Sequence, residues 1–332
     1  MREKFEQLLH MANQKKVTDI HFILMKHHLQ VQVRGWNGLE YIHNSAFDEG
    51  LFHYLKYISK LDLGNTLQPQ NGNFTYHFQN EKLYFRFSLL PTLEKQTAVL
   101  RILNNHHEIT LDHLSTSEYQ YQSFLSWTKI RSGLIVLSGP TGSGKTTTLH
   151  AILKKIASDN RLRVVSLEDP IEIVEQSYLQ LQINEAIGFT YEEGIRELMR
   201  HDPDVIMIGE IRDSKTARML LRGALSGHLI FTTIHAKNCA EAIKRLYEFG
   251  LNKQDLHHTL TAVTAQRLYQ RKGTTERVCI YEILEKDELE YYFENQEYSK
   301  KHNDIYQEIQ NAVSRGIISK EEAIMDVPYD NR

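Results

Sequence analysis

A glycine-rich segment near the middle of the chain carries residue types that bind phosphate groups. It begins at Gly139 and ends at Thr146, between an apolar run at 134–137 and a stretch at 147–156 whose apolar residues recur at helical spacing. A strand, a glycine-rich loop and a helix in that order are the context of a phosphate-binding loop. Glycines let backbone N–H groups point at a polyphosphate, and the helix N-terminus adds partial positive charge. The segment therefore predicts a nucleoside triphosphate site rather than a chance glycine-rich turn.

Two side chains of this segment have separate roles in such a site. The Lys145 ammonium would reach the β- and γ-phosphates, and the Thr146 hydroxyl would be a ligand of Mg²⁺. The candidate nucleotide-binding residues are Gly139, Pro140, Thr141, Gly142, Ser143, Gly144, Lys145, Thr146 and Thr147.

Three carboxylates follow the next apolar run. A strand expected at 163–168 leads into Glu168, Asp169 and Glu172. In open parallel sheets ligands bind beyond the carboxyl ends of the strands, so these side chains would share an edge with the glycine-rich segment. Neighbouring carboxylates repel one another unless Mg²⁺ or water uses them, and a hydrolase needs a carboxylate to orient the attacking water. A solvated acidic turn is the alternative interpretation.

A fourth carboxylate ends another apolar strand. The strand expected at 205–208 leads into Gly209 and Glu210. Glu210 would lie next to the bound Mg²⁺, where it could hold a ligating water or polarise the nucleophile. Asp213, a little further along, also suits the N-cap of the next helix.

Two histidines bracket a strand expected at 229–233. His235 follows the strand and would reach the same edge as the carboxylates, whereas His228 precedes it and would lie at the opposite end. Both could instead be structural residues that cap backbone groups. A metal role is disfavoured because no third histidine lies nearby in the sequence.

The elements around these residues fall into two patterns. Residues 1–104 predict a mixed α/β domain with an antiparallel sheet. Its helices are expected at 3–13 and 47–60, and its strands at 19–24, 29–34, 74–78, 82–87 and 96–103. Residues 105–114 include a polar, unpatterned stretch that we interpret as a linker.

Residues 115–285 alternate strands with helices, which predicts a mainly parallel sheet wrapped by helices. In addition to the strands named above, helices are expected at 147–158, 191–201, 214–226 and 240–249. Residues 286–332 are charged and tyrosine-rich, with Ile305, Ile309 and Val313 at helical spacing, and predict a helical tail.

The composition is that of an ordinary globular chain, and it disfavours several classes of function. A net charge of −3 offers no global attraction to nucleic acid or anionic lipid. Two cysteines without a CxxC pair suit a reducing compartment. The polar N-terminus does not resemble a signal peptide, and no apolar run approaches the roughly 18 residues of a membrane span.

Taken together, four segments resemble the signature boxes of the secretion and type IV pilus motor ATPases. GPTGSGKT resembles Walker A, EDPIE the Asp box, DPDVIMIGEIRD Walker B, and GHLIFTTIH the His box. The resemblance spans roughly residues 17–285. Further segments resemble the family within that range: Val17-Thr-Asp-Ile-His21, the stretch from Arg86 to Leu103, Gln266-Arg-Leu268 and Ile280-Tyr-Glu-Ile-Leu284.

The resemblance implies a PAS-like N-terminal domain, a RecA-like P-loop domain and a ring of six subunits that binds ATP and Mg²⁺ between the domains. It implies that Glu172 orients or activates water and that Glu210 supports Mg²⁺. Arg86 and Arg101 are similar to arginines that reach the γ-phosphate, where a guanidinium stabilises transition-state charge. Without the family they would be interpreted as outward strand residues.

Departures from the family pattern narrow the resemblance. The chain has no room for the further N-terminal domain of the larger assembly ATPases. The short segment 269–279 has one cysteine where those ATPases have a four-cysteine zinc motif, so no zinc is expected. Lys95-Gln96 stands where the family has Gly-Glu.

A short, zinc-free chain is similar to the competence-pilus ATPases of Gram-positive bacteria. That implies a cytoplasmic motor at the inner face of the membrane, which acts on a polytopic platform protein and adds pilin for DNA uptake. It implies no direct nucleic-acid contact. A retraction motor, a RecA-like nucleic-acid translocase and a nucleotide-gated scaffold are the alternatives.

Overall fold

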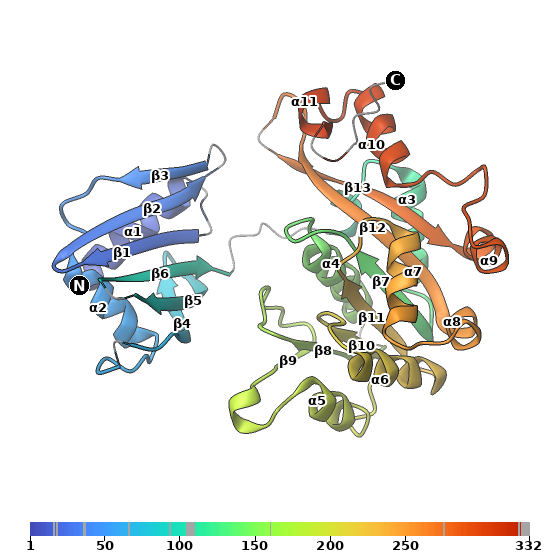
Figure 1. Ribbon diagram of the computed structural model, residues 1–332, viewed down its shortest axis with the longest axis horizontal. Coiled ribbons are helices and arrows are strands. Elements are labelled where there is room, and N and C mark those ends of the chain that lie inside the picture. The colour runs from blue at the N-terminus through green and yellow to red at the C-terminus, as the bar shows by residue number, and fades with distance from the viewer. Residues whose placement is uncertain are drawn as a thin grey trace. The chain divides into compact units, whose positions relative to one another are not determined.

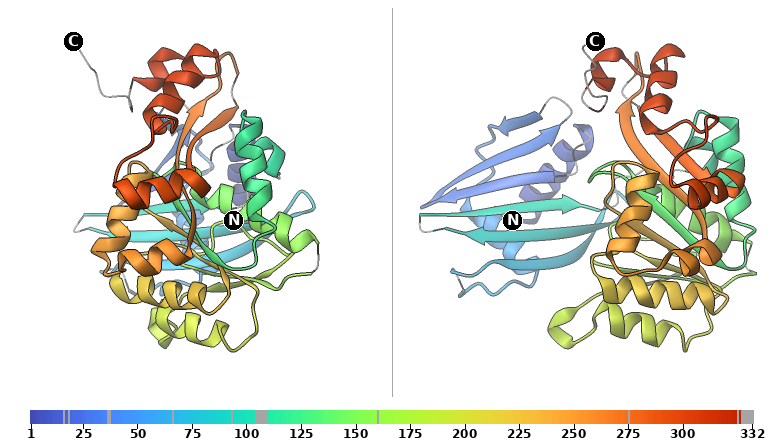
Figure 2. Two further views of the ribbon diagram at one scale, coloured as in Figure 1. Left: turned by 90° about the vertical axis from the view of Figure 1, so that its right-hand side faces the viewer. Right: turned by 45° about the vertical axis from the view of Figure 1, so that its right-hand side comes forward.

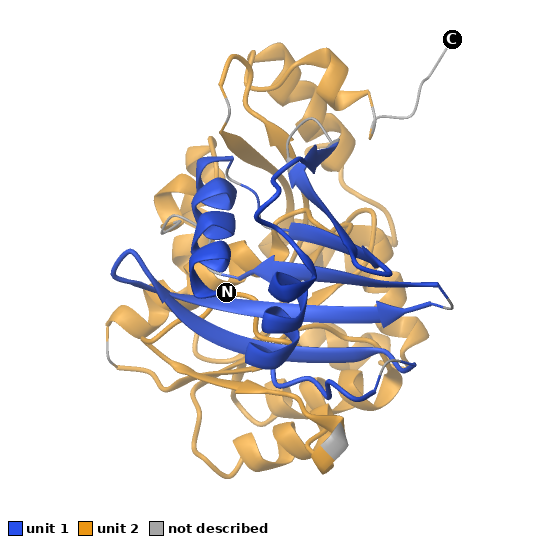
Figure 3. Ribbon diagram, turned by 90° about the vertical axis from the view of Figure 1, so that its left-hand side faces the viewer, with its two compact units in different colours: residues 1–107 blue, residues 108–332 orange. Residues whose placement is uncertain are grey.

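The computed structural model in Figure 1 divides the chain into two compact units, residues 1–107 and 108–332 (Figure 3). The described residues are 1–15, 17, 19–35, 38–65, 67–92, 94–103, 110–159, 161–274, 276–324 and 326. The first half of the linker expected at 105–114 precedes residue 110 and lies outside them; its last residues include a short 3₁₀ turn, Leu111–His113.

Unit 1 is built on a six-stranded sheet in the order β3-β2-β1-β6-β5-β4, and every neighbouring pair is antiparallel. The strands are β1 Asp19–Met25, β2 His28–Gly35, β3 Gly38–Ile42, β4 Gln70–Phe78, β5 Glu81–Pro91 and β6 Lys95–Ile102. The sequence predicted all of these strands except β3. The helices are α1 Arg2–Gln14 and α2 Glu49–Ile58.

The core of unit 1 lies on one face of this sheet. Alternate residues of the strands are buried there, as a period of two requires when one face is covered. The rings of Phe5 on α1 and Phe85 on β5 meet at 5.7 Å, and those of Phe52 on α2 and Phe22 on β1 meet at 6.4 Å. Both helices therefore cover the same face, and the other face carries the polar residues of the strands.

Unit 2 contains a seven-stranded sheet in the order β13-β12-β7-β11-β10-β8-β9. All neighbouring strands are parallel except β12 and β13, which pair antiparallel as a hairpin. The strands are β7 Gly133–Ser138, β8 Val164–Glu168, β9 Leu179–Gln182, β10 Val205–Ile208, β11 Leu229–Ile234, β12 Leu260–Gln270 and β13 Arg277–Glu285. The mainly parallel sheet that the sequence predicted is confirmed, although neither β9 nor the β12–β13 hairpin was foreseen.

Helices cover both faces of this sheet (Figure 2). They are α3 Glu118–Trp127, α4 Lys145–Ser158, α5 Tyr191–Leu198, α6 Ser214–Leu225, α7 Cys239–Glu248, α8 Lys253–Thr259 and α9 Lys286–Asn295. Along β7, Leu134 and Val136 join the core under α5 to α9, whereas Ile135 and Leu137 join the core under α3 and α4. Burial on both faces explains why these strands appear in the sequence as continuous apolar runs.

The segment after residue 285 packs on unit 2 in more than one way. The apolar side of α9 joins the main core through Leu289, Tyr292 and Phe293. The helices α10 Ile305–Ser314 and α11 Lys320–Ala323 form a smaller core with the hairpin strands. Within the part of the chain that the structure describes, no helix has the length and apolarity needed to cross a membrane.

Candidate functional site

The glycine-rich segment forms a tight loop between β7 and α4. Gly139 has φ +148°, and a Cβ built there would lie 2.5 Å from the Ser143 hydroxyl and 2.7 Å from the Gln266 carbonyl. Gly144 is in the left-handed conformation at the N-cap of α4, which carries no side-chain cap and no acid in its first turn. These glycines give the loop its curvature, and the uncapped helix start provides the donors and partial positive charge that attract an anion.

Lys145 is the first residue of α4, and only 8% of its surface is exposed. Its ammonium donates to the carbonyls of Gly139 and Pro140, both at 2.9 Å. Burial lowers the pKa of Lys145 to about 8, against the opposing effect of Glu210 and Glu172. The two carboxylates are thus close enough to act on the ammonium electrostatically.

The three carboxylates at the end of β8 have different surroundings. Glu168 is buried, and it accepts hydrogen bonds from the Ser166 hydroxyl at 2.6 Å and the Gln180 amide at 3.0 Å. Asp169 and Glu172 are exposed. Glu168 therefore belongs to a buried network, and Glu172 is the side chain of this group that is both free to meet solvent and near Lys145.

Glu210, at the end of β10, is brought together with His235 from the end of β11. The distance from Glu210 Oε2 to His235 Nε2 is 3.3 Å. The second oxygen of Glu210 accepts from the Arg212 guanidinium, which also donates to Asp169 at 3.1 Å. Arg212 thereby connects the acids of β8 and β10, a role that sequence reasoning missed although Arg212 follows Glu210 by two residues.

His228 lies elsewhere, at the start of β11. Its Nδ1 is 3.1 Å from the Gly223 carbonyl at the end of α6. Asp213 has the capping role suggested by the sequence, since its side chain accepts from the Thr216 N–H at the start of the same helix. The structure thus brings His235, but not His228, to the edge where the carboxylates lie.

Arg86 and Arg101 are in unit 1, where they face one another across β5 and β6. Arg101 Nε donates to Asp19 Oδ1 on β1 at 2.7 Å. Since strand partners point to the same side of a sheet, the two guanidiniums lie on the face opposite the helices.

Residues of the β12–β13 hairpin contact the phosphate-binding loop and the start of α4. No role was predicted for them from the sequence. The Gln266 amide donates to the Ser143 carbonyl at 2.7 Å, and the Cys279 thiol lies 3.7 Å from the same oxygen. The Tyr281 hydroxyl is 2.9 Å from that of Thr148 on α4. The only hint in the sequence was that polar residues interrupt an otherwise apolar run.

The oxygen donors at this edge fit a divalent cation that is completed by phosphate. Mg²⁺ prefers oxygen ligands and is usually bound by one or two protein groups together with substrate phosphates and water. The Thr146 hydroxyl and the Glu210 carboxylate are such groups. Among the described residues no three His, Cys, Asp or Glu side chains are arranged to hold a metal ion, so a self-sufficient protein cage is absent there.

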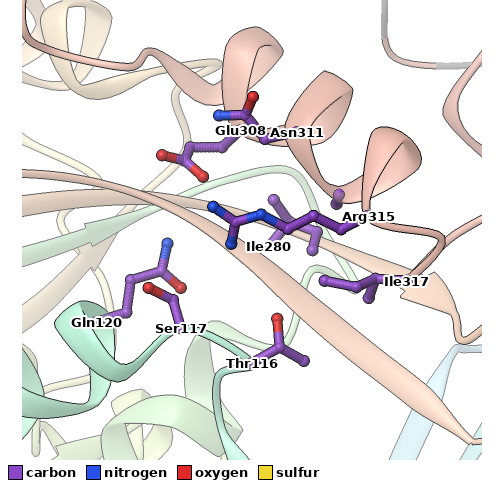
Figure 4. Close-up of a pocket in the computed structure, with 9 residues that line it drawn as sticks. Thr116, Ser117, Gln120, Ile280, Glu308, Asn311, Arg315 and Ile317 are labelled. Atoms are coloured by element: carbon purple, nitrogen blue, oxygen red, sulfur yellow. The ribbon is translucent and has the colours of Figure 1, made fainter.

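A small hollow of about 20 Å³ lies away from this edge, between the start of α3, β13 and α10 (Figure 4). Gln120, Glu308 and Arg315 are among its polar lining residues. The volume suits about one water molecule and not a nucleotide.

The whole sequence matches one known family, described as type II/IV secretion system protein, over residues 2–325. The chain belongs to that family. It is therefore an ATP hydrolase of the pilus and secretion motors, which uses ATP with a divalent metal.

Its relatives include two competence proteins named ComGA. That of Bacillus subtilis is 33% identical over 94% of this chain and 92% of its own length. That of Halalkalibacterium halodurans is 37% identical over 71% and 73%. The resemblance to competence-pilus ATPases that the sequence indicated is thereby confirmed.

Solved structures share the fold. The pilus retraction motor PilT with bound ADP superimposes with a TM-score of 0.76 and 24% identity, over 97% of this chain and 96% of that chain. The ATPase DotB of Legionella pneumophila gives 0.77 and 20%, over 97% and 94%. These similarities confirm the predicted fold class, an N-terminal α/β domain followed by a RecA-like ATPase domain.

Proposed function

We propose that this chain is a hexameric cytoplasmic motor that hydrolyses ATP to assemble a competence pilus for DNA uptake. The observation that carries the proposal is the convergence of Glu172, Glu210 and His235 near Lys145 at one edge of the sheet. Similarity to ComGA over nearly the full length supports the choice of a competence pilus.

The phosphate-binding part of the site consists of the 139–147 loop and α4. Backbone N–H groups and the Lys145 ammonium bind the β- and γ-phosphates, and Lys145 exchanges its two carbonyl acceptors for phosphate oxygens. The Thr146 hydroxyl and Glu210, partly through water, would hold Mg²⁺, which neutralises charge on those oxygens when it is bound.

The hydrolytic part of the site depends on Glu172. Its exposed carboxylate orients the attacking water and accepts its proton. His235 and Arg212 hold Glu210 in place, and Glu168 and Asp169 support the same edge from β8. Arg86 and Arg101, from this subunit or from a neighbouring one, would supply positive charge to the γ-phosphate in the transition state.

The partners follow from the same assignment. Six copies form the ring, and a polytopic platform protein at the inner face of the cell membrane receives the motion. The motor requires neither direct nucleic-acid contact nor zinc. Elemental analysis of the purified ring and salt-dependent titration with single-stranded DNA test these last two statements.

Matched variants test the site. Lys145→Ala should lose ATP binding and hydrolysis. Glu172→Gln should bind ATP normally but hydrolyse it at least about 10²-fold more slowly, because the base is lost and the phosphate contacts remain. The exposed acid variant Glu185→Gln is the control and should keep the wild-type rate. Equal turnover by Glu172→Gln and the control would refute the role of Glu172.

Deletion of the gene tests the biological direction of the motor. Loss of surface pili and of DNA uptake supports assembly. Accumulated pili would identify a retraction motor instead.

A further inference from the structure

One buried imidazole contacts two different groups near the nucleotide site. His150 lies on α4, in the second turn after Lys145, and only 5% of its surface is exposed. Its Nδ1 forms a hydrogen bond with the Tyr178 hydroxyl, and its Nε2 lies 3.4 Å from Glu168 Oε2. Both sides of the ring are therefore occupied by polar groups from outside its own helix.

These two groups bracket the segment that carries Glu172. Glu168 is the last residue of β8, and Tyr178 directly precedes β9. Because β8 and β9 are neighbouring parallel strands, the residues between them form the connection across that edge of the sheet. One side chain of α4 thus contacts the connection at both of its ends.

The connection is also tied together internally. The Gln180 amide donates to Glu168 and, at 2.8 Å, to the Ile173 carbonyl, while its oxygen accepts from the Glu175 N–H at 2.7 Å. The chain on either side of Glu172 consequently has few independent ways to move relative to β8.

The protonation state of Tyr178 is compatible with this arrangement. Burial, with Glu168 and Glu175 nearby, raises the pKa of Tyr178 far above its ordinary value, so its hydroxyl keeps its proton and can donate to Nδ1. The opposite ring nitrogen then carries the ring hydrogen, and it lies 3.4 Å from Glu168 Oε2.

We propose that His150 is a positioning residue that fixes Glu172 relative to the phosphate-binding loop through Glu168 and Tyr178. The proposal rests on the role of Glu172 given above. A water that is misplaced by about 1 Å can lower the rate about 10²-fold. A rigid connection between α4 and Glu172 should therefore raise kcat. The phosphates themselves contact the loop, which precedes His150.

The experiment measures ATP hydrolysis by full-length variants. His150→Phe keeps a ring of similar size and removes both polar contacts, so kcat should fall about tenfold while KM for ATP changes by less than twofold. Tyr178→Phe removes one oxygen and should lower kcat about threefold to fivefold. In the double variant kcat should be no lower than in His150→Phe, because the tyrosine contact is then already lost.

A partial rescue distinguishes positioning from packing. His150→Asn places an amide oxygen near the position of Nδ1, where it can still accept from Tyr178, and kcat should lie between those of wild type and His150→Phe. If His150→Phe, Tyr178→Phe and the double variant all show wild-type kcat, the proposal is overturned. It is also overturned if KM rises as much as kcat falls. Should His150→Phe not fold, the kcat of Tyr178→Phe decides the question.

The chain contains a matched control. His302 is also buried and lies 3.2 Å from the buried Glu282, but it is in the segment after α9. His302→Phe should lower the melting temperature and leave kcat of the folded protein within twofold. If Glu172→Gln is inactive while the His150 and Tyr178 variants are fully active, the positioning role alone fails and the proposed function stands.

Discussion

The two sides of the unit 2 sheet treat buried polar groups differently. At the nucleotide side, buried atoms such as Ser143 Oγ and Gln266 Oε1 have no hydrogen-bond partner within the described chain. On the tail side, the buried Glu282 accepts from the N–H groups of Cys239 and Ile305 and lies near His302. The loop therefore has unused hydrogen-bonding capacity beside it, whereas the Glu282 carboxylate has a partner for both of its oxygens.

This difference separates function from stability. Buried polar atoms without partners cost free energy, and such costs gather at sites where a ligand is bound. Fully partnered carboxylates, by contrast, hold elements together, and removal of one partner leaves the others unpaired. Substitutions on the tail side should therefore mainly lower the free energy of unfolding. Substitutions on the nucleotide side should mainly change ATP binding and hydrolysis.

The largest effect is expected at Glu282. Glu282→Ala leaves His302 and two helix-terminal N–H groups without their acceptor, so the free energy of unfolding should fall by about 3–5 kcal/mol. Denaturant unfolding followed by circular dichroism measures it. The control, Glu290→Ala, removes an exposed acid that pairs with His257 and should cost less than about 1 kcal/mol. Equal costs for the two variants would erase the contrast between the two sides.

The next largest effect concerns pH at the nucleotide side. The pKa of Lys145 is lowered to about 8 by burial, so in the free enzyme the ammonium loses its proton as pH rises through 8. Because kcat/KM reports the free enzyme, it should fall about tenfold from pH 7 to pH 9. Lys145→Arg, whose guanidinium stays charged, should remove this inflection even if its rate is lower. A flat wild-type profile would contradict the prediction.

A smaller effect is expected behind the loop. Gln266→Leu removes the donor to the Ser143 carbonyl, which leaves a loop acceptor unpaired, so KM for ATP should rise about fivefold, or about 1 kcal/mol. Steady-state kinetics at saturating Mg²⁺ measures it. Gln270→Leu alters the same strand at an exposed position and should leave KM unchanged. A lower kcat with constant KM would mean that Gln266 does not support nucleotide binding.

The smallest effect is expected at Asp326. This acid accepts from Arg267 at 3.3 Å and from the Tyr269 hydroxyl at 2.8 Å, and 34% of its side chain is exposed. Arg267 also donates to the carbonyls of Gln266 and Lys237. Asp326→Asn should therefore lower the free energy of unfolding by only about 0.5–1 kcal/mol. A loss as large as that of Glu282→Ala would show that the tail side depends on this contact.

The sequence predicted β7, β8, β10 and β11, because apolar residues fill both of their faces, but it did not predict β9, which is only partly buried. It did not predict β12, where the buried Gln266 and Arg267 donate to the loop, to the chain near Lys237 and to the tail. The sequence also did not predict α3, where Gln120 can be buried because its amide donates to the Tyr281 carbonyl. Such positions depend on partners that are far away in the chain.

The site shows the same limit. Spacing alone identified the phosphate-binding loop, because Gly139 and Lys145 act within one short segment. Spacing could not distinguish Glu168 from Glu172. The sequence pattern of an acid at the end of a strand does not depend on whether that acid faces solvent or His150. The Arg212 contact with Asp169 likewise exists only because β8 and β10 are neighbours.

Glu282 has a further consequence for the order in which the chain folds. Its partner Cys239 precedes it by 43 residues, whereas Ile305 follows it by 23. During synthesis from the N-terminus, the carboxylate is made before two of its three partners, His302 and Ile305. The strand that carries it can be buried without penalty only after the ribosome has added residues 302–305. The ATPase core and its tail should therefore become stable in one cooperative step rather than in succession.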